Sequence, residues 1–423
     1  ANIETLALTG GGDVDGTGNE LANLILGNDG ANRLDGRGGA DTMRGGGGDD
    51  VYAVDEAGDR AVELAGGGRD RVETALDFTL GAGLEDLTLG GAAVAGTGNA
   101  LANEIIGNGA HNRLDGRAGA DRMAGGGGDD LYVVDDAGDA VVESDGEGSD
   151  RVEASVSYAL GANVEALALV GPDAIEGTGN ALANTITGNA AANRLDGAAG
   201  ADRMIGGAGD DTYLVEAFED EIIEGASGGI DTVLSSGSYR LAGWVERLVL
   251  VGEATDGIGN ALDNEIIGND GINVLDGGDG DDRLVGGGGL DIMKGGDGGD
   301  RLDGGGGRDL LTGGAGADHF LFGAPIDGVV NIDDLTDFVA GEDSLHLDRA
   351  VFEGIAADGA LGEEAFHVGA EAADAGDRLI YNQTSGEIFY DADGTGAAAA
   401  ILFARVEAGT VLTHLDFAAY SQG

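Results

Sequence analysis

The sequence predicts an all-β protein: a parallel β-solenoid of nine-residue turn-and-strand units, set within repeats of about 80 residues and followed by a C-terminal β domain that caps it. Glycine makes up 86 of 423 residues, which excludes an ordinary helical domain because each glycine in a helix interior costs roughly 1 kcal/mol. Apolar residues make up 42%, too many for a disordered chain. The third observation is repetition at two periods.

The charge balance limits the classes of partner that the chain can bind. The chain carries 79 acidic and 21 basic residues, a formal net charge of −58, which argues against nucleic acid and anionic membranes and favours cations. No apolar run of about 18 residues occurs, so we expect no transmembrane segment. No cysteine is present, which excludes disulfides and thiolate metal sites. The chain begins ANIETLAL without a signal-peptide pattern, so we expect either export signalled elsewhere or a fragment.

The longer period appears first in the segment NIETLAL. It returns as GLEDLTL, NVEALAL and WVERLVL, with glutamates at Glu4, Glu85, Glu165 and Glu246, spacings of 81, 80 and 81 residues. These repeats predict a first domain over residues 1–262. Residues 263–320 continue the shorter period without a break and are expected to form a second domain.

The shorter period is nine residues. It places an Asn or Asp at every ninth position and a large apolar residue two positions later, as in Asp121 with Met123 and Asp130 with Tyr132. Six turn residues and three extended residues suit a coil of two strands and two turns, about 18 residues around. The apolar residue is expected to point inward, since side chains alternate along a strand. We therefore interpret Tyr52, Tyr132 and Tyr213 as core residues.

Aspartates one coil apart should then stack on the same side. The predicted stacks are Asp41 with Asp59, Asp121 with Asp139, Asp202 with Asp220, Asp282 with Asp300 and Asp318, Asp291 with Asp309, and, 20 residues apart, Asp50 with Asp70, Asp130 with Asp150 and Asp211 with Asp231. Stacked carboxylates repel unless a cation lies between them, and hard oxygen ligands favour Ca²⁺. Nine such pairs predict about nine calcium ions, which would change the net charge from −58 to −40.

The best units read GGGGDDVYA, GGGGDDLYV, GGAGDDTYL, GGDGDDRLV and GGGGRDLLT. They resemble the GGxGxDxUx nonapeptide of RTX calcium-binding proteins, and the resemblance covers residues 1–320. It implies a right-handed parallel β-roll in which each ion also takes backbone carbonyls from two successive same-side turns. By position, the carbonyls would belong to Gly45, Gly125, Gly206, Gly277, Gly295, Gly296, Gly298, Gly313 and Gly314.

Two parts of each repeat depart from this pattern. In the first turns Asn replaces Asp, and we expect those turns to form hydrogen-bonded ladders poor in calcium; the positions are Asn23, Asn32, Asn103, Asn112, Asn184, Asn193, Asn264 and Asn273. The stretch from Asp70 to Asn103 is richer in β-branched residues and divides into three steps of eleven, which predicts wider coils held by apolar packing.

The nonapeptide stops after Phe320, and residues 321–423 are expected to form a cap. This segment resembles the terminal domain of serralysin-type exoproteins, with Asp337-Phe338 and Gly341-Glu342-Asp343 in the expected order. A hairpin turning at Thr384-Ser385-Gly386 would cover the edge of the last coil. The resemblance implies that this end also carries a type I secretion signal.

The motifs that could be catalytic have simpler structural interpretations. Ser227 fits G-x-S-x-G but occupies a glycine-turn position, and the five histidines form no H-E-x-x-H motif. Glu85, Glu165 and Glu246 recur with apolar flanks, which favours a stacked structural carboxylate over acid/base catalysis. No catalytic residue is therefore assigned.

The first hypothesis is a secreted, non-enzymatic, calcium-binding structural or surface module that folds on calcium after export. Its partners would be calcium ions and the type I secretion machinery, with self-association or a cell-surface polysaccharide left open. The second hypothesis is the C-terminal calcium and secretion module of a larger exoenzyme such as a protease, lipase or epimerase. A third, a β-helix enzyme acting on polysaccharide, is disfavoured because an active site should interrupt the repeat at one place.

Overall fold

The structure is a computed structural model that describes residues 2–64, 66–216, 219–355 and 358–421. Every regular element in the described residues is a β-strand, apart from two short 3-10 turns, η1 (Glu363–Ala365) and η2 (His414–Asp416). The chain divides into two compact units, residues 1–208 with 219–221 and residues 209–218 with 222–423, and each is described by itself. The predicted all-β class is confirmed.

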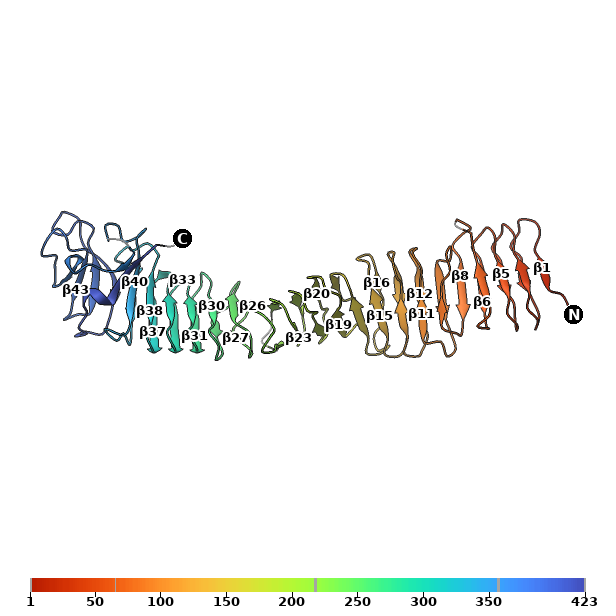
Figure 1. Cartoon of the computed structure of the whole chain (residues 1–423), viewed down its shortest axis with the longest axis horizontal. Coiled ribbons are helices and arrows are strands. Elements are labelled where there is room, and N and C mark those ends of the chain that lie inside the picture. The colour runs from red at the N-terminus through yellow and green to blue at the C-terminus, as the bar shows by residue number, and fades with distance from the viewer. Residues whose placement is uncertain (1, 65, 217–218, 356–357, 422–423) are drawn as a thin grey trace. The chain divides into compact units, whose positions relative to one another are not determined.

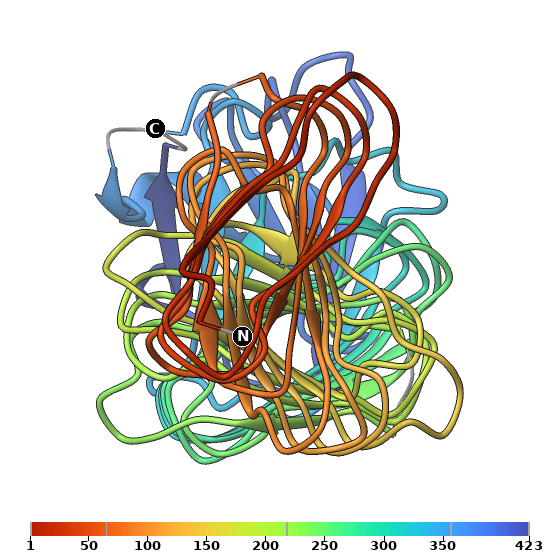
Figure 2. The same cartoon turned by 90° about the vertical axis from the view of Figure 1, so that its right-hand side faces the viewer.

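The first unit is a parallel β-solenoid with two strands per coil. Equivalent positions of successive coils are 18 residues apart, so that Leu24 of β3 lies beside Thr42 of β5 and the N–H of Asn23 meets Asp41. Odd-numbered and even-numbered strands form separate sheets, and the coils of β1 to β16 follow one another along the stack (Figure 1). Seen along the stack, these coils are closed loops around a shared interior (Figure 2). The coil length predicted from the sequence is confirmed.

The strands of the first unit fall into four ladders. They are β1 (Thr5–Ala7), β3 (Leu24–Leu26), β5 (Thr42–Arg44) and β7 (Arg60–Val62); β2 (Gly16–Thr17), β4 (Arg33–Asp35), β6 (Val51–Val54), β8 (Arg71–Thr74), β10 (Asp86–Leu89), β12 (Glu104–Ile106), β14 (Arg122–Ala124) and β16 (Ala140–Val141); β9 (Phe78–Thr79), β11 (Ala95–Thr97), β13 (Arg113–Asp115), β15 (Leu131–Val134), β17 (Arg151–Ala154), β19 (Ala166–Leu169), β21 (Thr185–Thr187) and β23 (Arg203–Ile205); and β18 (Tyr158–Ala159), β20 (Glu176–Thr178) and β22 (Arg194–Asp196).

The longer period corresponds to a half-integer number of coils. The first repeat contains nine strands in the described residues, β1 to β9, and the next repeat begins at β10. Because each coil uses two strands, a repeat is four and a half coils. Equivalent features of successive repeats in this unit therefore lie on opposite faces: β10 belongs to the even-numbered ladder, whereas β1 and β19 belong to odd-numbered ladders.

The stretch after Asp70 differs from the expected steps of eleven. The coil from Asp50 to Asp70 takes 20 residues and places Val51 of β6 beside Arg71 of β8. The next step, from Asp70 to Glu85, takes only 15 residues and places Asp86 of β10 beside Arg71. The step after that returns to the ordinary coil length, with Asp86 beside Glu104. One long coil is thus followed by one short coil, which is possible because β9 has only two residues and the tight turn at residues 81–83 follows it.

The interior is one row of apolar side chains for each ladder. The inward residues predicted from the nine-residue spacing are buried, including Ile105, Leu114, Met123 and Tyr132, each 0% exposed. Their neighbours along each strand are half-buried or exposed, as the alternating burial of β15 shows. The predicted core is confirmed.

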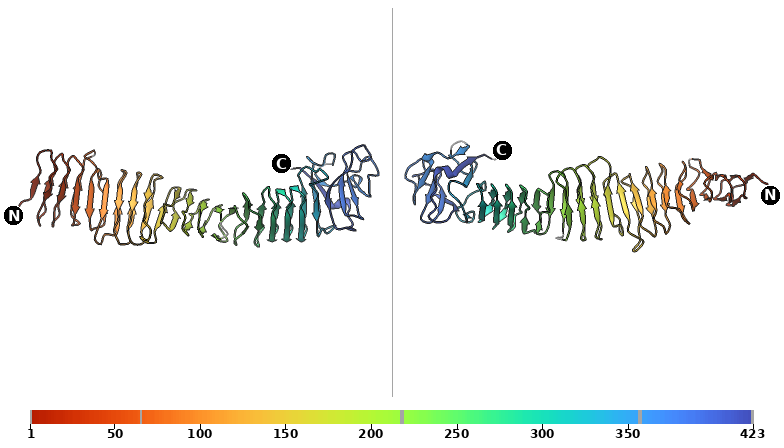
Figure 3. Two further views of the ribbon diagram at one scale, coloured as in Figure 1. Left: turned by 180° about the vertical axis from the view of Figure 1, so that it is seen from behind. Right: turned by 60° about the horizontal axis from the view of Figure 1, so that its bottom comes forward.

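The second unit continues the same construction in two main ladders and a short glycine pair (Figure 3). One ladder is β24 (Thr212–Val215), β26 (Thr232–Ser235), β28 (Arg247–Leu250), β30 (Glu265–Ile267), β32 (Arg283–Val285), β35 (Arg301–Asp303), β38 (His319–Phe322), β40 (Ser344–Asp348), β46 (Phe417–Tyr420) and β41 (Gly359–Ala360). The other is β27 (Tyr239–Arg240), β29 (Asp256–Ile258), β31 (Val274–Asp279), β34 (Ile292–Asp297), β37 (Leu310–Ala315), β39 (Asp333–Leu335), β45 (Ile401–Arg405), β44 (Glu387–Tyr390), β43 (Leu379–Asn382) and β42 (Phe366–Val368); the glycine pair is β33 (Gly288–Gly289) with β36 (Gly306–Gly307), and β25 (Glu221–Ile223) lies between β24 and β26 in sequence.

The C-terminal segment closes the end of the second unit. Strands β39 and β40 add one further coil on β37 and β38, and β45 and β46 then pair with them in parallel. Strands β43 and β44 form an antiparallel hairpin whose turn includes Gly386 at φ +80°, where the sequence predicted it. The edge of the roll is thereby paired instead of exposed. In the part of the chain described, no helix is long and apolar enough to span a membrane.

Candidate metal centres

The aspartates of the nonapeptide turns form hydrogen-bonded columns along the solenoid. Each Oδ1 accepts the backbone N–H of the equivalent residue one coil earlier: Asp41 donates to Asp59 at 2.9 Å, and Asp282 donates to Asp300 at 2.9 Å. The same bond joins the other predicted pairs, Asp50 with Asp70, Asp121 with Asp139, Asp130 with Asp150, Asp202 with Asp220, Asp211 with Asp231, Asp291 with Asp309, and Asp300 with Asp318. The predicted stacking is confirmed for all nine pairs.

The second carboxylate oxygen of most of these aspartates has no hydrogen-bond partner although it is buried. These Oδ2 atoms belong to Asp41, Asp50, Asp70, Asp121, Asp130, Asp150, Asp202, Asp231, Asp282, Asp291, Asp300, Asp309 and Asp318. A buried charged oxygen without a partner is costly, and native proteins rarely leave one. A row of them at one turn position therefore fits a cation that supplies the missing contact.

Backbone carbonyls converge on the same points. A Cβ placed on Gly277 would lie 2.2 Å from Asp282 Oδ2 and 2.7 Å from the carbonyl oxygen of Gly295, and one on Gly295 would lie 2.1 Å from Asp300 Oδ2 and 2.5 Å from the carbonyl oxygen of Gly313. Each missing Cβ thus leaves room beside a carboxylate oxygen and the next coil's carbonyl. Oxygen donors of this kind are the ligands that Ca²⁺ takes, so these residues fit calcium.

The other glycines predicted to supply carbonyls lie in the same turns. The carbonyl oxygens of Gly45, Gly125 and Gly206 each lie beside the first glycine of the preceding same-side turn. Gly296, Gly298 and Gly314 adopt φ of +133°, +141° and +114°, and each packs on the carbonyl of the glycine one coil earlier. A side chain is excluded at these three positions by both the dihedral and the close approach.

Two of the predicted aspartate ligands, Asp59 and Asp139, already use their second carboxylate oxygen in hydrogen bonds. Asp59 Oδ2 accepts the N–H groups of Asp55 and Glu56, each at 3.1 Å, and Asp139 Oδ2 accepts those of Asp135 and Asp136. These aspartates close their own turns, so each contributes no free oxygen to the pair it forms. The pairs Asp41–Asp59 and Asp121–Asp139 therefore offer fewer ligands than Asp282–Asp300.

The asparagine turns are satisfied within the protein. Asn264 Oδ1 accepts the N–H of Asn260 at 2.7 Å, and its Nδ2 donates to the carbonyl of Val245 at 3.2 Å. Asn23, Asn32, Asn103, Asn112, Asn184 and Asn273 make equivalent bonds to a carbonyl one coil earlier. The predicted amide ladder is confirmed; poor calcium binding there stays a prediction.

Burial changes the ionisation of the aspartate columns. It raises the pKa of Asp282 and Asp291 to about 7, against the lowering effect of the backbone hydrogen bonds, and the carboxylate one coil further along raises each pKa as well. Burial likewise raises the pKa of Asp70 to about 7, and of Asp50, Asp121, Asp130, Asp231 and Asp318 to about 6. Burial without a cation therefore favours the neutral, protonated form of these carboxyl groups more than in free aspartate.

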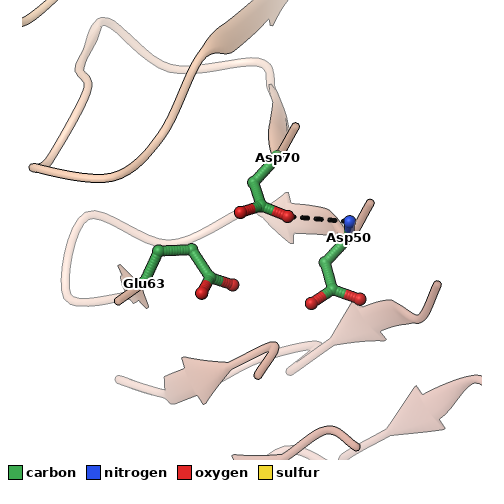
Figure 4. A group of neighbouring side chains, drawn as sticks. All are labelled: Asp50, Glu63 and Asp70. Atoms are coloured by element: carbon green, nitrogen blue, oxygen red, sulfur yellow. Dashed lines mark hydrogen bonds between the residues drawn. The ribbon is translucent and has the colours of Figure 1, made fainter. Parts of the chain in front are cut away.

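Three acidic clusters contain a residue that the nonapeptide pattern does not include. Asp50 and Asp70 are joined by Glu63, Asp130 and Asp150 by Glu143, and Asp211 and Asp231 by Glu224, with ligand atoms in each group within 4.8 Å of one another. Figure 4 shows the Glu63 carboxylate pointing toward Asp50 and Asp70. The signal was in the sequence: the three glutamates are 80 and 81 residues apart.

The columns also extend beyond the predicted aspartate pairs. Glu85 Oε2 accepts the N–H of Asp70 at 2.9 Å, so this glutamate occupies the next stacking position, as expected of a structural carboxylate; Glu165 and Glu246 do the same for Asp150 and Asp231. In the cap, Asp333 accepts from Asp309 and Asp343 from Asp318. Asp333 and Asp343 follow their partners Asp309 and Asp318 by 24 and 25 residues, so the nine-residue spacing does not predict them.

Comparison with known proteins agrees with these observations. The family model of the RTX calcium-binding nonapeptide repeat (4 copies) matches residues 17–52, 97–132, 178–213, 258–293 and 294–324. Among solved structures, the AlgE6R3 subunit of a mannuronan C5-epimerase from Azotobacter vinelandii is 24% identical over 38% of this chain and 80% of its own length, with a TM-score of 0.19, on which no conclusion rests. A search of curated proteins found no match. The matched segments contain 11 of the 17 stacked aspartates described above, and RTX calcium-binding nonapeptide repeats therefore occur in these five segments of the solenoid.

Proposed function

We propose that the protein is a secreted, non-enzymatic module that folds when calcium fills its aspartate columns outside the cell. The single observation that carries the proposal is the row of buried, partnerless Oδ2 atoms, of which those of Asp282, Asp291 and Asp300 each lie beside a glycine that also faces a carbonyl oxygen of the next coil. The predicted ligands are the stacked aspartates and the glycine carbonyls named above, for about nine ions. Extracellular modules bind calcium at about 10⁻⁴ to 10⁻³ M, whereas cytosolic levels would leave such sites empty.

Repulsion between the stacked carboxylates makes folding depend on calcium. Two carboxylates one strand spacing apart (~4.8 Å) repel by about 3 kcal/mol at an effective dielectric constant of about 20. The column through Asp282, Asp300 and Asp318 holds three such groups in succession, and the whole chain carries −58. This repulsion disfavours the roll until cations neutralise it, so binding free energy becomes folding free energy.

The arrangement of buried acids supports a structural role. In the described residues, the stacked aspartates recur at equivalent positions of the repeats, whereas an active site should break the repetition once. Export would follow from the serralysin-like C-terminal segment. A host that carries a type I secretion system is expected to release the full chain into the medium, and the same host without the transporter is expected to retain it.

Calcium titration of the full chain tests the proposal. Circular dichroism should show little β signal in EGTA and a cooperative gain as calcium rises into the millimolar range, while magnesium at the same concentration should give much less because it prefers smaller octahedral sites. A chain that is fully folded in EGTA and indifferent to calcium would contradict the proposal.

A further inference from the structure

We propose that each Asp–Glu–Asp cluster, Asp50–Glu63–Asp70 and its two copies, is a second and tighter class of cation site, built from side chains and held in place by a buried tyrosine. The inference rests on the proposed calcium loading, because the cation is taken to be the same. It goes beyond the nonapeptide, which contains neither the glutamate nor its position.

The distances within each cluster suit one ion. Calcium–oxygen bonds are about 2.3–2.6 Å, so two ligands of one ion lie at most about 5 Å apart. The ligand atoms of Asp50, Glu63 and Asp70 lie within 4.8 Å of one another, as do those of the two copies. Figure 4 shows the glutamate reaching in from the chain segment between the two aspartates.

Unsatisfied oxygens point to a ligand independently of the negative charge. Asp70 is 0% exposed and Asp150 1% exposed, and the Oδ2 atom of each has no hydrogen-bond partner. In the second cluster Glu143 Oε2 is also buried without a partner. Three carboxylates that only repelled one another would not be expected in the interior at two neighbouring repeats.

A tyrosine fixes the glutamate in each cluster. The hydroxyl of Tyr52 donates to Glu63 Oε1 and accepts the N–H of Gly45 at 2.7 Å, and Tyr132 does the same with Glu143 and Gly125 at 2.6 Å. Tyr213 donates to Glu224. The tyrosines are fully buried core residues, as expected, and their hydroxyls add a positioning role that the burial pattern alone did not show.

The long coil explains why these sites differ from the others. The step from Asp50 to Asp70 is 20 residues, longer than the ordinary coil, and the segment between them carries Glu63. An ordinary pair such as Asp282–Asp300 has two carboxylates and completes its ligands with carbonyls. Three carboxylates on a rigid frame raise calcium affinity, since ligand charge and rigidity set it. In the first unit the clusters at β6 and β15 lie on opposite faces.

Terbium luminescence can observe these sites selectively in the full chain. Tb³⁺ replaces calcium at oxygen sites and emits strongly when a nearby tyrosine or tryptophan is excited. Residues 263–320 contain no tyrosine or tryptophan, so their sites should be silent, and Trp244→Phe removes the remaining indole. In this background, the first phase of sensitised emission should account for about three ions, and the Asp121–Asp139 pair, which lies near Tyr158, should add a later phase.

The variant Glu63→Gln/Glu143→Gln/Glu224→Gln tests the glutamates. We expect sensitised emission to fall several-fold, and the number of calcium ions bound in equilibrium dialysis to fall by about three, with the remaining sites unchanged. The matched control Glu20→Gln/Glu176→Gln/Glu253→Gln removes the same charge from three exposed glutamates and should change neither measurement. Tyr52→Phe/Tyr132→Phe/Tyr213→Phe also removes the groups that sensitise terbium, so it is measured by equilibrium dialysis alone: the ion number should stay the same, and the three tightest ions should bind more weakly.

The outcomes separate this inference from the proposed function. If the wild-type chain binds no calcium, the proposed function fails. If it binds calcium but the triple glutamine variant keeps the full ion number and the early phase, the clusters hold shared protons instead of a cation, and only this inference is overturned. Should the triple variant not fold in saturating calcium, the single variant Glu63→Gln is expected to lose one ion and decides the question.

Discussion

The asparagine turns and the aspartate turns of this solenoid share a backbone ladder but differ in what they leave unsatisfied. Asn264 and Asp282 occupy successive positions of one column, and the N–H of Asn264 donates to Asp282 Oδ1 at 2.7 Å. The amide of Asn264 then completes its own bonds with Asn260 and Val245, whereas Asp282 keeps a buried oxygen with no partner. The change from the amide nitrogen of Asn to the second carboxylate oxygen of Asp therefore distinguishes a turn whose hydrogen bonds are all made within the protein from a turn that needs a cation.

This difference suggests that the two kinds of turn in each repeat form under different conditions. The asparagine turns can form as soon as the coils meet, because every polar group has a protein partner. The aspartate turns can form without cost only when protons or cations neutralise them. We therefore expect each repeat to alternate calcium-independent coils with calcium-dependent coils, and variants that replace Asp by Asn test this expectation.

The largest effect is expected from converting three stacked aspartates of two neighbouring columns to asparagine. In Asp282→Asn/Asp291→Asn/Asp300→Asn the neutral amides should abolish binding at the pairs they belong to, lowering the bound calcium by about three ions, and should raise the folded fraction in EGTA because repulsion is removed. Equilibrium dialysis measures the first effect and circular dichroism the second.

The control for that variant removes equal charge elsewhere. Glu253→Gln/Asp270→Asn/Asp297→Asn changes three exposed acids of the same region. It should leave the ion number and the folded fraction in EGTA close to wild type. An equal gain of structure in both variants would mean that overall net charge, not the buried columns, opposes folding.

The second effect is a pH dependence of the calcium-free chain. Burial raises the folded pKa of Asp70, Asp282 and Asp291 to about 7, above the ordinary value of 3.8. A raised folded pKa contributes stability that is complete below the unfolded value and is lost as pH rises through the folded value. In EGTA the Tm and the β signal should therefore increase as pH falls from about 8 to about 5.

The calcium affinity should change with pH in the direction opposite to the stability of the calcium-free chain. Protons and calcium compete for the same oxygens, so the apparent calcium affinity should fall over the pH range in which the calcium-free fold gains stability. Isothermal titration at several pH values measures the competition through the protons released. The variant Asp282→Asn/Asp291→Asn/Asp300→Asn should show a smaller pH response in EGTA; a full response would mean that the titrating groups are not these three aspartates.

The sequence was sufficient for features that repeat with a fixed spacing. The coil length, the inward residues such as Met123 and the stacking of Asp121 on Asp139 all follow from the nine-residue period, because one strand and one turn need that many residues. Features that depend on where the period changes do not follow from the nine-residue spacing alone. Glu63 joins Asp50 and Asp70 because the coil there is 20 residues long, and Asp333 continues a column after a 24-residue step.

The smallest effect concerns a single glycine. A Cβ on Gly304 would lie 2.4 Å from Asp309 Oδ2, in the space proposed for an ion, whereas a Cβ on Gly306 of the same turn would meet nothing within 4 Å. Neither glycine has a positive φ, so alanine is compatible with the backbone at both positions. Gly304→Ala should lose about one calcium ion and shift the calcium midpoint of folding upward, because the methyl group displaces a ligand or the ion.

Gly306→Ala is the matched control, since it adds the same methyl group two residues away. It should bind as many ions as wild type and should be slightly stabilised, by about 0.4–1 kcal/mol, because alanine lowers the entropy of the unfolded chain. Dialysis with radioactive calcium and thermal unfolding in saturating calcium measure the two quantities. Equal ion numbers in the two variants would show that the space beside Gly304 is not where the cation binds, and would move the proposed ligands to the other oxygens of the turn.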